Sequence, residues 1–474
     1  MHRNNYLKGN KLQLKIFMLF ILLSSILLSG AKAQEVMKLT FEEAVQRALK
    51  ENITLKTENN NLLVNQIQKT NAIGQFLPNL NASATLSNVT GNQFIQQQAT
   101  LVNTSTSSFS PSLSSNMLLF GGLRNVNSLK RANSSFDAQQ NLIKRTEQDI
   151  MYNVSQQFLT VLLDQELVKI AQENIDVQKK QLERIAAFVE SGITFKGDQF
   201  NLEAQIKSLE LAEVQAINQL ENDKSLLAQT LMLDPMTTIE VVTPDQTVES
   251  FLVEEFDLSE LYTTAMQNRP DFKQFKSLKE TGDYAVAVAR ADYYPTLTAF
   301  FDYGSYYNNT AEDALYDTDG ELIGYEKVSF QEQIRERNPQ TVIGLQLSIP
   351  IFSRFNTKTS VVTAKIQRDN AQLNIENLER TIFLDVQTAL QNYDAALASY
   401  EAASSQYDAA KISMDTQTER YTVGLGNIID LTTSSNTFVQ ASVDKANASY
   451  TLLFQKIILD YQTGVLNAEN ISLN

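Results

Sequence analysis

The chain has 474 residues and contains no cysteine, no tryptophan and a single histidine, His2. Beyond residue 2 it therefore offers neither thiolate nor imidazole, which excludes Cys and His zinc sites, thiol catalysis and Ser-His-Asp chemistry. Without cysteine there is also no disulfide framework. Enzymes built on paired carboxylates stay open, but no acidic pair stands out from solvated helix faces. We expect no enzyme activity, no cofactor and no bound metal.

Long hydrophobic runs are missing except near the start. Arg3 and Lys8 precede an apolar stretch at 16–28, and Ala31-Lys-Ala33 follows it. This layout predicts a signal peptide at 1–33 with a small-residue cleavage site. No later segment approaches the roughly 18 consecutive apolar residues of a spanning helix. If the protein enters a membrane, we expect it to do so as strands.

Basic residues are scarce relative to acidic ones. The whole chain has 39 Lys and Arg against 54 Asp and Glu, a net charge of −15. Without residues 1–33, 34 Lys and Arg remain against 54 acids, a charge of −20. Nucleic acid is not expected as a partner, because its binding depends on clustered cations that neutralise phosphates.

Glycine and proline are few, 16 and 8, and they gather at junctions. Neither occurs between Gly122 and Gly192 or between Pro350 and Gly424. As helices, these stretches of about 65 residues would each extend about 100 Å, far beyond the usual 8 to 20 residues. They predict the helices of a coiled coil or a tube.

Heptad spacing supports long helices in both stretches. From Ile382 to Met414, small and apolar residues recur at steps of four and three, with Ala alternating with Tyr. From Met151 to Val189 the same rhythm continues, but Gln165, Gln172 and Lys179 occupy seam positions. A row of heptad positions that includes small and polar residues favours helices packed around water. A solid structural coiled coil stays an alternative.

Alternating apolar and polar residues predict four strands, near 78–89, 109–120, 295–307 and 340–352. Tyrosines stand at their ends, as in membrane barrels with aromatic girdles, although soluble sandwich strands alternate in the same way. The polar segment 87–108 and the acidic segment 308–338 are expected to be outward-facing loops, solvated or disordered.

The pattern occurs twice. Pro78 and Pro295 are 217 positions apart, whereas Phe120 and Phe352 are 232 apart. We predict a first repeat at 34–245 and a second at 246–474. Each contains a helix, a strand pair, a long helix, a tip and a returning helix. The expected shorter helices are 41–76 and 199–233 in the first repeat, and 258–292 and 429–461 in the second. An extended linker is expected at 234–255.

Four strands per chain cannot close a barrel, because about eight are the minimum and open edges are not tolerated in lipid. Two copies would give eight strands with an interior filled by side chains. Three copies would give twelve strands and room for a passage. A homotrimer is therefore the better prediction.

Taken together, these features resemble those of the TolC-type outer-membrane efflux proteins. The resemblance covers essentially all of the chain after the predicted signal peptide. The residues that carry the resemblance are Leu39-Thr-Phe-Glu-Glu-Ala44, Ala48-Leu49, Asn52, Phe76-Leu77-Pro78, Phe120-Gly121-Gly122, Tyr294-Pro295, Ile349-Pro350-Ile351-Phe352, and the two tips that contain Gly192 and Gly424. The resemblance implies a mixed α and transmembrane β fold: a trimeric twelve-stranded outer-membrane barrel, continuous with a long periplasmic α-helical barrel. It also implies a passive export duct in the outer membrane. Its partners would be outer-membrane lipid, a periplasmic adaptor and an inner-membrane pump.

The resemblance also assigns roles at the tips. Gly192, Tyr421, Val423 and Gly424 match the motif of the adaptor-docking tip. Acidic positions just past each turn, which form the gate or constriction of the tube, correspond to Asp198 and Asp430.

Two positions depart from the family pattern. Relatives usually carry a second Asp where this chain has Thr433, and often a basic residue at Gly426. Both the double acidic ring and the ion-pair latch of the closed state are therefore expected to be incomplete in this chain.

Other interpretations stay open. Asp430 could simply cap its helix, and Tyr421 could serve packing. The whole chain could be a non-conducting envelope-spanning coiled coil, or a periplasmic carboxylate enzyme.

Overall fold

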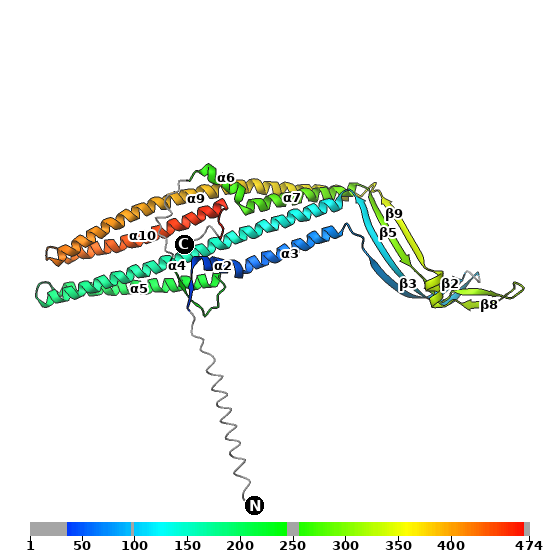
Figure 1. The fold of residues 1–474 in the computed structure, drawn as a ribbon, viewed down its shortest axis with the longest axis horizontal. Helices are drawn as coiled ribbons and strands as arrows, with labels where there is room; N and C mark the ends of the chain where they lie inside the picture. Colours follow the sequence, from blue (N-terminus) through cyan, green and yellow to red (C-terminus); the bar gives the residue numbers. More distant parts are fainter. Residues whose placement is uncertain (1–35, 96–98, 244–255, 469–474) are drawn as a thin grey trace, which may run out of the picture. The chain divides into compact units, whose positions relative to one another are not determined.

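The computed structural model describes residues 36–95, 99–243 and 256–468, which form two compact units (Figure 1). The described part of unit 1 consists of 36–56, 144–243, 256–269 and 381–468. Unit 2 consists of 57–95, 99–143 and 270–380. The predicted signal peptide, 1–33, lies outside the described residues. Within them, every helix is too short or too polar to cross a membrane.

Two helices of 67 residues dominate the chain, as the lack of glycine and proline predicted. They are α4 (Arg124–Glu190) and α9 (Asn356–Thr422), and each contributes residues to both units. Each is followed by a returning helix in unit 1, α5 (Lys196–Thr230) and α10 (Ile428–Thr463). The first residues of α4 and α9 are 232 positions apart, and so are those of α5 and α10.

The helices expected at 41–76 and 258–292 are each broken in two. The first forms α2 (Phe41–Glu51) and α3 (Ile53–Gly74), and the second forms α6 (Leu258–Asn268) and α7 (Pro270–Arg290). The breaks fall at Asn52 and Arg269, where the backbone is extended, with ψ angles of 127° and 120°. Arg269 precedes proline, whose ring excludes the helical conformation from the preceding residue. At Asn52 the side-chain oxygen accepts the Leu55 N–H at 3.1 Å and so starts the next helix.

Four antiparallel strands form the sheet of unit 2. They are β2 (Asn81–Ile95), β3 (Thr100–Gly121), β5 (Thr296–Gly304) and β9 (Gln340–Ser348), paired in that order. A short fifth strand, β6 (Tyr307–Asn308), also pairs with β3. Among the described residues, β2 and β9 each have one edge without a partner strand.

The polar segment 87–108, expected as a loop, is mostly strand. Its hydroxyl side chains bond to each other across β2 and β3: Ser87 to Ser108 at 2.8 Å and Thr90 to Ser105 at 3.0 Å. Threonine also favours the extended backbone, and paired hydroxyls on facing positions stabilise a sheet. The loop prediction was wrong because it was based on polarity alone.

The acidic segment 308–338 is an ordered insertion. It contains β7 (Glu312–Tyr316), β8 (Leu322–Lys327), the helical turn α8 (Phe330–Glu332) and η3 (Gln333–Arg337). The Arg337 guanidinium donates two hydrogen bonds to the Asp313 carboxylate, at 2.6 and 2.5 Å. This pairing lowers the pKa of the Asp313 carboxyl. A buried Gln333 amide donates to two main-chain carbonyls and ties the segment together.

Just before each long helix, two consecutive residues adopt the left-handed conformation. They are Gly122 and Leu123 ahead of α4, with φ of +61° and +63°, and Arg354 and Phe355 ahead of α9, with φ of +49° and +61°. The two pairs are again 232 positions apart. This conformation costs roughly 1–2 kcal/mol for a residue other than glycine, so the chain carries backbone strain at Leu123, Arg354 and Phe355.

In unit 1, the linker expected at 234–255 contains a strand, β4 (Thr238–Val241), and residues 244–255 are not described. This strand pairs in parallel with β1 (Val36–Leu39). Close by in the chain, the buried Phe41 ring of α2 packs edge-on against Phe158 of α4, with centroids 5.2 Å apart. The start of the described chain is thus anchored on α4.

A pair of carboxyl groups lies between α4 and α5. Asp164 is 7% exposed, its Oδ2 atom has no hydrogen-bond partner, and the Asp223 carboxyl lies near enough to act on it electrostatically. Burial, reinforced by Asp223, raises the pKa of the Asp164 carboxyl to about 7. The folded chain therefore holds this proton more tightly than the unfolded chain, in which the pKa of an aspartate is about 4.

Asp164 should make the protein less stable as the pH rises. Stability falls between about pH 4 and pH 7 and stays reduced above that, because the folded state must then bury an ionised group. Asp164→Asn keeps the shape and removes the charge. We expect it to melt at a higher temperature than the parent at about pH 8 and at a similar temperature near pH 4.5, followed by circular dichroism.

The exposed Asp176 on the same helix provides the control, Asp176→Asn. A difference between Asp164→Asn and the parent that is equal at all pH values would contradict a titrating carboxyl pair.

Candidate functional site at the helix tips

The first tip closes α4 with a glycine in the left-handed conformation. Gly192 has φ of +72°. Its N–H donates to the Val189 carbonyl at 3.1 Å, and the next N–H, of Ile193, donates to the Phe188 carbonyl at 2.8 Å. These two bonds make a Schellman cap, which satisfies carbonyls that the helix end would leave unpaired.

The second tip repeats this geometry at the end of α9. Gly424 has φ of +78°. Its N–H donates to the Tyr421 carbonyl at 3.1 Å, and the Leu425 N–H donates to the Arg420 carbonyl at 2.8 Å. Two residues on, a Cβ at Gly426 would stand 3.0 Å from the Tyr421 main-chain nitrogen. The turn is therefore tight enough to favour glycine at the position where relatives often carry a basic residue.

The two aspartates occupy the same place in their helices, the third residue of α5 and of α10. Asp430 donates its main-chain N–H to the Asn427 side-chain oxygen at 2.8 Å, and its carboxylate accepts the Asn427 side-chain amide at 2.9 Å. The Asp198 carboxylate accepts the Thr194 hydroxyl at 2.7 Å. Both carboxylates thus stabilise a helix N-terminus, where negative charge is favoured. Asp430 is nevertheless exposed.

Tyr421 joins the second tip to the first. It packs against the buried cluster of Ile185, Leu202 and Ile206, and its ring centroid lies 6.3 Å from that of Phe188. Burial and the negative charge of Asp198 raise the pKa of the Tyr421 hydroxyl. Tyr421 therefore provides packing between the two tips. This packing role was one of the interpretations that the sequence left open.

Apolar side chains project into solvent around both turns. The exposed fractions are 70% for Ile193, 83% for Phe195, 69% for Val423, 75% for Leu425 and 72% for Ile429. We call these five residues the tip surface. Sequence analysis identified Val423 and missed the others, although each lies within a few residues of a turn glycine. Exposed apolar groups of this kind are typical of protein contact sites.

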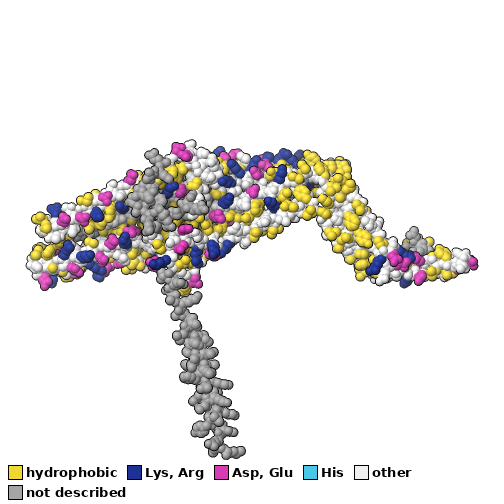
Figure 2. All heavy atoms as spheres, viewed as in Figure 1, with side chains coloured by type: hydrophobic (Ala, Val, Ile, Leu, Met, Phe, Trp, Pro, Cys, Tyr) yellow, Lys and Arg dark blue, Asp and Glu magenta, His cyan; other side chains and the backbone are white. Residues whose placement is uncertain are grey.

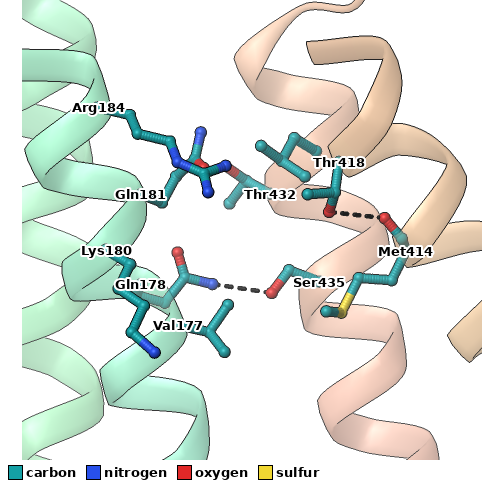
Figure 3. Close-up of a pocket in the computed structure, with 10 residues that line it drawn as sticks. Val177, Gln178, Lys180, Gln181, Arg184, Met414, Thr418, Thr432 and Ser435 are labelled. Atoms are coloured by element: carbon teal, nitrogen blue, oxygen red, sulfur yellow. Dashed lines mark hydrogen bonds between the residues drawn. The ribbon is translucent and has the colours of Figure 1, made fainter. Parts of the chain in front are cut away.

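A cavity of about 130 Å³ lies between α4 and the pair α9 and α10, shortly before the tips (Figure 3). On one side, the buried Gln178 amide of α4 donates to the Ser435 hydroxyl of α10 at 2.8 Å. On the other side, Arg184 and Gln181 extend toward Thr432. The volume can hold several water molecules, each of which needs roughly 10–15 Å³ of such space. The helix contacts here are thus polar and incompletely packed. The sequence did not identify this cavity.

Within the part of the chain that the structure describes, no cluster of three or more acidic, His or Cys side chains could hold a metal ion.

Comparison with known proteins gives consistent matches. Residues 261–464 match the family model described as outer membrane efflux protein. The chain is 20% identical over 453 residues to the outer membrane efflux protein BepC of Brucella suis, covering 96% of this chain and 91% of that protein. It is 24% identical over 132 residues to TolC of Salmonella enteritidis, which is 28% of this chain and 27% of that protein.

The fold matches as well. The Campylobacter jejuni CmeC outer membrane channel superposes with a TM-score of 0.71 at 18% sequence identity, covering 91% of this chain and 88% of that chain.

The turn glycines can be tested for their conformation. In Gly424→Ala the new Cβ would meet nothing within 4 Å, so the cost is backbone strain alone, roughly 1–2 kcal/mol. We expect a lower melting temperature for the detergent-solubilised protein. Gly197→Ala, in the first turn of α5, also meets nothing and has no positive φ. It should be neutral or slightly stabilising, and equal losses in both variants would argue against the left-handed cap.

Proposed function

Because residues 261–464 match the outer membrane efflux protein family and 96% of the chain aligns with such a protein, we propose that the chain is the outer-membrane duct of a tripartite efflux or secretion system. In this role it conducts substrates passively from periplasm to exterior while docked to an adaptor and an inner-membrane pump. The family consists of channel proteins located in the outer membrane and is not a family of enzymes. The observation that carries the proposal is the sheet of unit 2, with an apolar face and two unpaired edges.

The outer strand β9 has the length and pattern of a membrane strand. Its nine residues match the roughly 9–11 that cross the hydrocarbon layer. Ile343, Leu345 and Leu347 are 77%, 66% and 60% exposed and alternate with Gly344 and Gln346. Figure 2 shows hydrophobic side chains covering much of the visible face of the sheet. In lipid, this apolar face would be favourably buried.

The unpaired edges support assembly into a homotrimer. In hydrocarbon, the free main-chain groups of β2 and β9 would each cost several kcal/mol. Pairing β9 of one copy with β2 of the next removes the edges, and three copies close a barrel of twelve strands. A dimer of eight strands would be filled by side chains.

Equivalent breaks support an internal duplication. The extended residues Asn52 and Arg269 are 217 positions apart, and in both cases the N–H donates at 2.9 Å to a buried alanine four residues earlier. The left-handed pairs before α4 and α9 are 232 apart. We propose two repeats, 34–245 and 246–474, whose helices form the periplasmic α-barrel of the trimer.

The tips are proposed as the adaptor-docking end. Gly192 and Gly424 set the shape of the turns, Tyr421 holds the second tip against the first, and Val423 belongs to the exposed tip surface. An adaptor that buries these apolar side chains would gain about 25 cal/mol for each Å² covered.

Asp430 and Asp198 are proposed to line the gate. Three Asp430 carboxylates brought together by the trimer axis would make the opening electronegative and favour cations. Their capping bonds do not compete with this role, because the partners Asn427 and Thr194 are neutral and leave the charge uncompensated.

The duct is tested with the full chain purified in detergent. We expect a trimer that conducts in planar bilayers and that restores resistance to dyes, bile acids, antibiotics or metals in cells lacking the gene. Val423→Asp should conduct like the parent but fail in cells, because a charge on the tip surface opposes burial against the adaptor. A soluble rod without conductance would instead support the non-conducting envelope spacer.

The gate is tested by cation block of the same channels. Asp430→Ala should weaken the block of single-channel conductance by divalent or trivalent cations, with a smaller effect for Asp198→Ala because that carboxylate is only partly exposed. Asn427→Ala removes the capping partner and keeps the charge, so block should persist in it. Unchanged block in Asp430→Ala would leave this aspartate a helix cap and nothing more.

A further inference from the structure

The cations of unit 2 are distributed unevenly. Residues 59–136 and 338–368 contain no Asp or Glu, although the whole chain has a net charge of −15. Their Lys and Arg residues avoid the strands and lie on the helical side of the sheet. Seven of them follow the ends of β3 and β9, and we call these the basic collar: Arg124, Lys130, Arg131, Arg354, Lys358, Lys365 and Arg368. Figure 2 shows Lys and Arg side chains gathered where α7 and the start of α9 lie, and those of α7 are not part of the collar.

Within the collar, three helices surround an open pocket of about 600 Å³. Helix α4 contributes Arg124 and Arg131, one above the other at a spacing of seven residues. From α9 come the hydroxyl groups of Thr359, Ser360 and Thr363 on a single face. The floor is the small-residue face of α7, which includes Ala285 and Ala289. Cationic and hydroxyl groups thus converge on one space.

The charge of this pocket is only partly neutralised. Arg124 forms an ion pair with Asp292, and Asp292 is the single carboxylate among the residues that line the pocket. Arg131 is exposed and makes no ion pair with any carboxylate of the described chain. One net positive charge therefore faces solvent in the pocket, with hydroxyl donors opposite it. This arrangement suits a phosphate group.

Exposed apolar and aromatic side chains border the collar on the side of the sheet. Leu123, Tyr294, Phe352 and Phe355 are all more than half exposed. The left-handed conformations of Leu123 and Phe355 fix the chain direction at this boundary. Aromatic residues with nearby cations are typical of the level at which a membrane protein meets lipid headgroups.

We propose that the pocket between Arg124, Arg131 and the hydroxyl face of α9 binds the phosphate headgroup of an anionic phospholipid from the periplasmic leaflet. The acyl chains then lie against the exposed Phe352, Phe355 and sheet face. This inference rests on the proposed insertion of the sheet in the outer membrane. It adds a specific lipid site, which anchors the helices at a fixed depth.

The test uses the full chain in an uncharged detergent, titrated with dioctanoyl phosphatidylglycerol and followed by native mass spectrometry. Arg131→Gln should weaken lipid binding about fivefold, and Arg124→Gln with Arg131→Gln about 25-fold, because each cation near a headgroup contributes a similar factor. Arg131→Lys keeps the charge and should retain most of the binding. Arg380→Gln is the control, since Arg380 is an exposed arginine of α9 outside the pocket.

Two further titrations identify the ligand. Dioctanoylglycerol, which lacks the phosphate, should bind weakly and equally to all variants. Inorganic phosphate should not displace the lipid at equal concentration. If it does, the pocket is a site for soluble anions and the lipid proposal fails. Equal lipid binding by the double variant and the parent would also overturn it.

Folding and function are controlled separately. Melting temperatures without lipid report on folding, and should Arg124→Gln unfold the protein by breaking its ion pair, the exposed Arg131→Gln still decides the outcome. Conductance in planar bilayers tests the duct independently. Loss of lipid binding with normal conductance supports the site, whereas absence of conductance in the parent refutes the duct and leaves the binding result to be judged by itself.

Discussion

Main-chain hydrogen bonding is the constraint on which the rest of this structure depends. In α4 and α9 it is satisfied within the helix for 67 residues, since no glycine or proline interrupts it. Unpaired main-chain groups therefore remain only at helix ends and sheet edges. The ends are closed by caps around Gly192 and Gly424, whereas β2 and β9 keep open edges. The proposed docking and assembly surfaces lie where the internal bonding ends.

The side chains that face inward could be predicted where the helix follows the heptad repeat. In α9, Ala389, Tyr393 and Ala396 are buried at the expected positions. In α4 the expected Ile175 is buried, but the buried residues that follow it are Gln178, Gln181 and Ile185, each one position before the expected Lys179, Leu182 and Ala186. The polar seam positions of α4 gave too weak a pattern to reveal this shift.

Other features depend on contacts between segments that are separate in the sequence, and no local sequence pattern reveals these contacts. The extension of β2 and β3 through the Ser- and Thr-rich segment depends on pairing between strands, and β4 forms because β1 lies beside it. By contrast, the helix break at Arg269 could be predicted from the sequence, because Pro270 follows it and excludes the helical conformation from the preceding residue. At the tips, a glycine followed by an aspartate predicted the turns correctly. The exposed Ile193 and Leu425 could not be predicted in this way, because an apolar side chain beside a turn glycine is exposed or buried according to the tertiary contacts of the turn.

The geometry of the second tip gives a physical cause for one of the two departures, the glycine at position 426. Close approach to the Tyr421 main chain disfavours a side chain at Gly426, so the basic residue that could neutralise Asp430 is absent there. The Asp430 carboxylate is instead held by the neutral Asn427 amide and keeps its full charge. Contact between the two tips then depends on the packing of Tyr421 against Ile185 and Phe188. Packing of this kind is little weakened by salt, whereas the field of exposed carboxylates is screened within about 10 Å at 0.1 M salt. Contact between the tips and the proposed preference of the opening for cations are therefore expected to respond differently to salt.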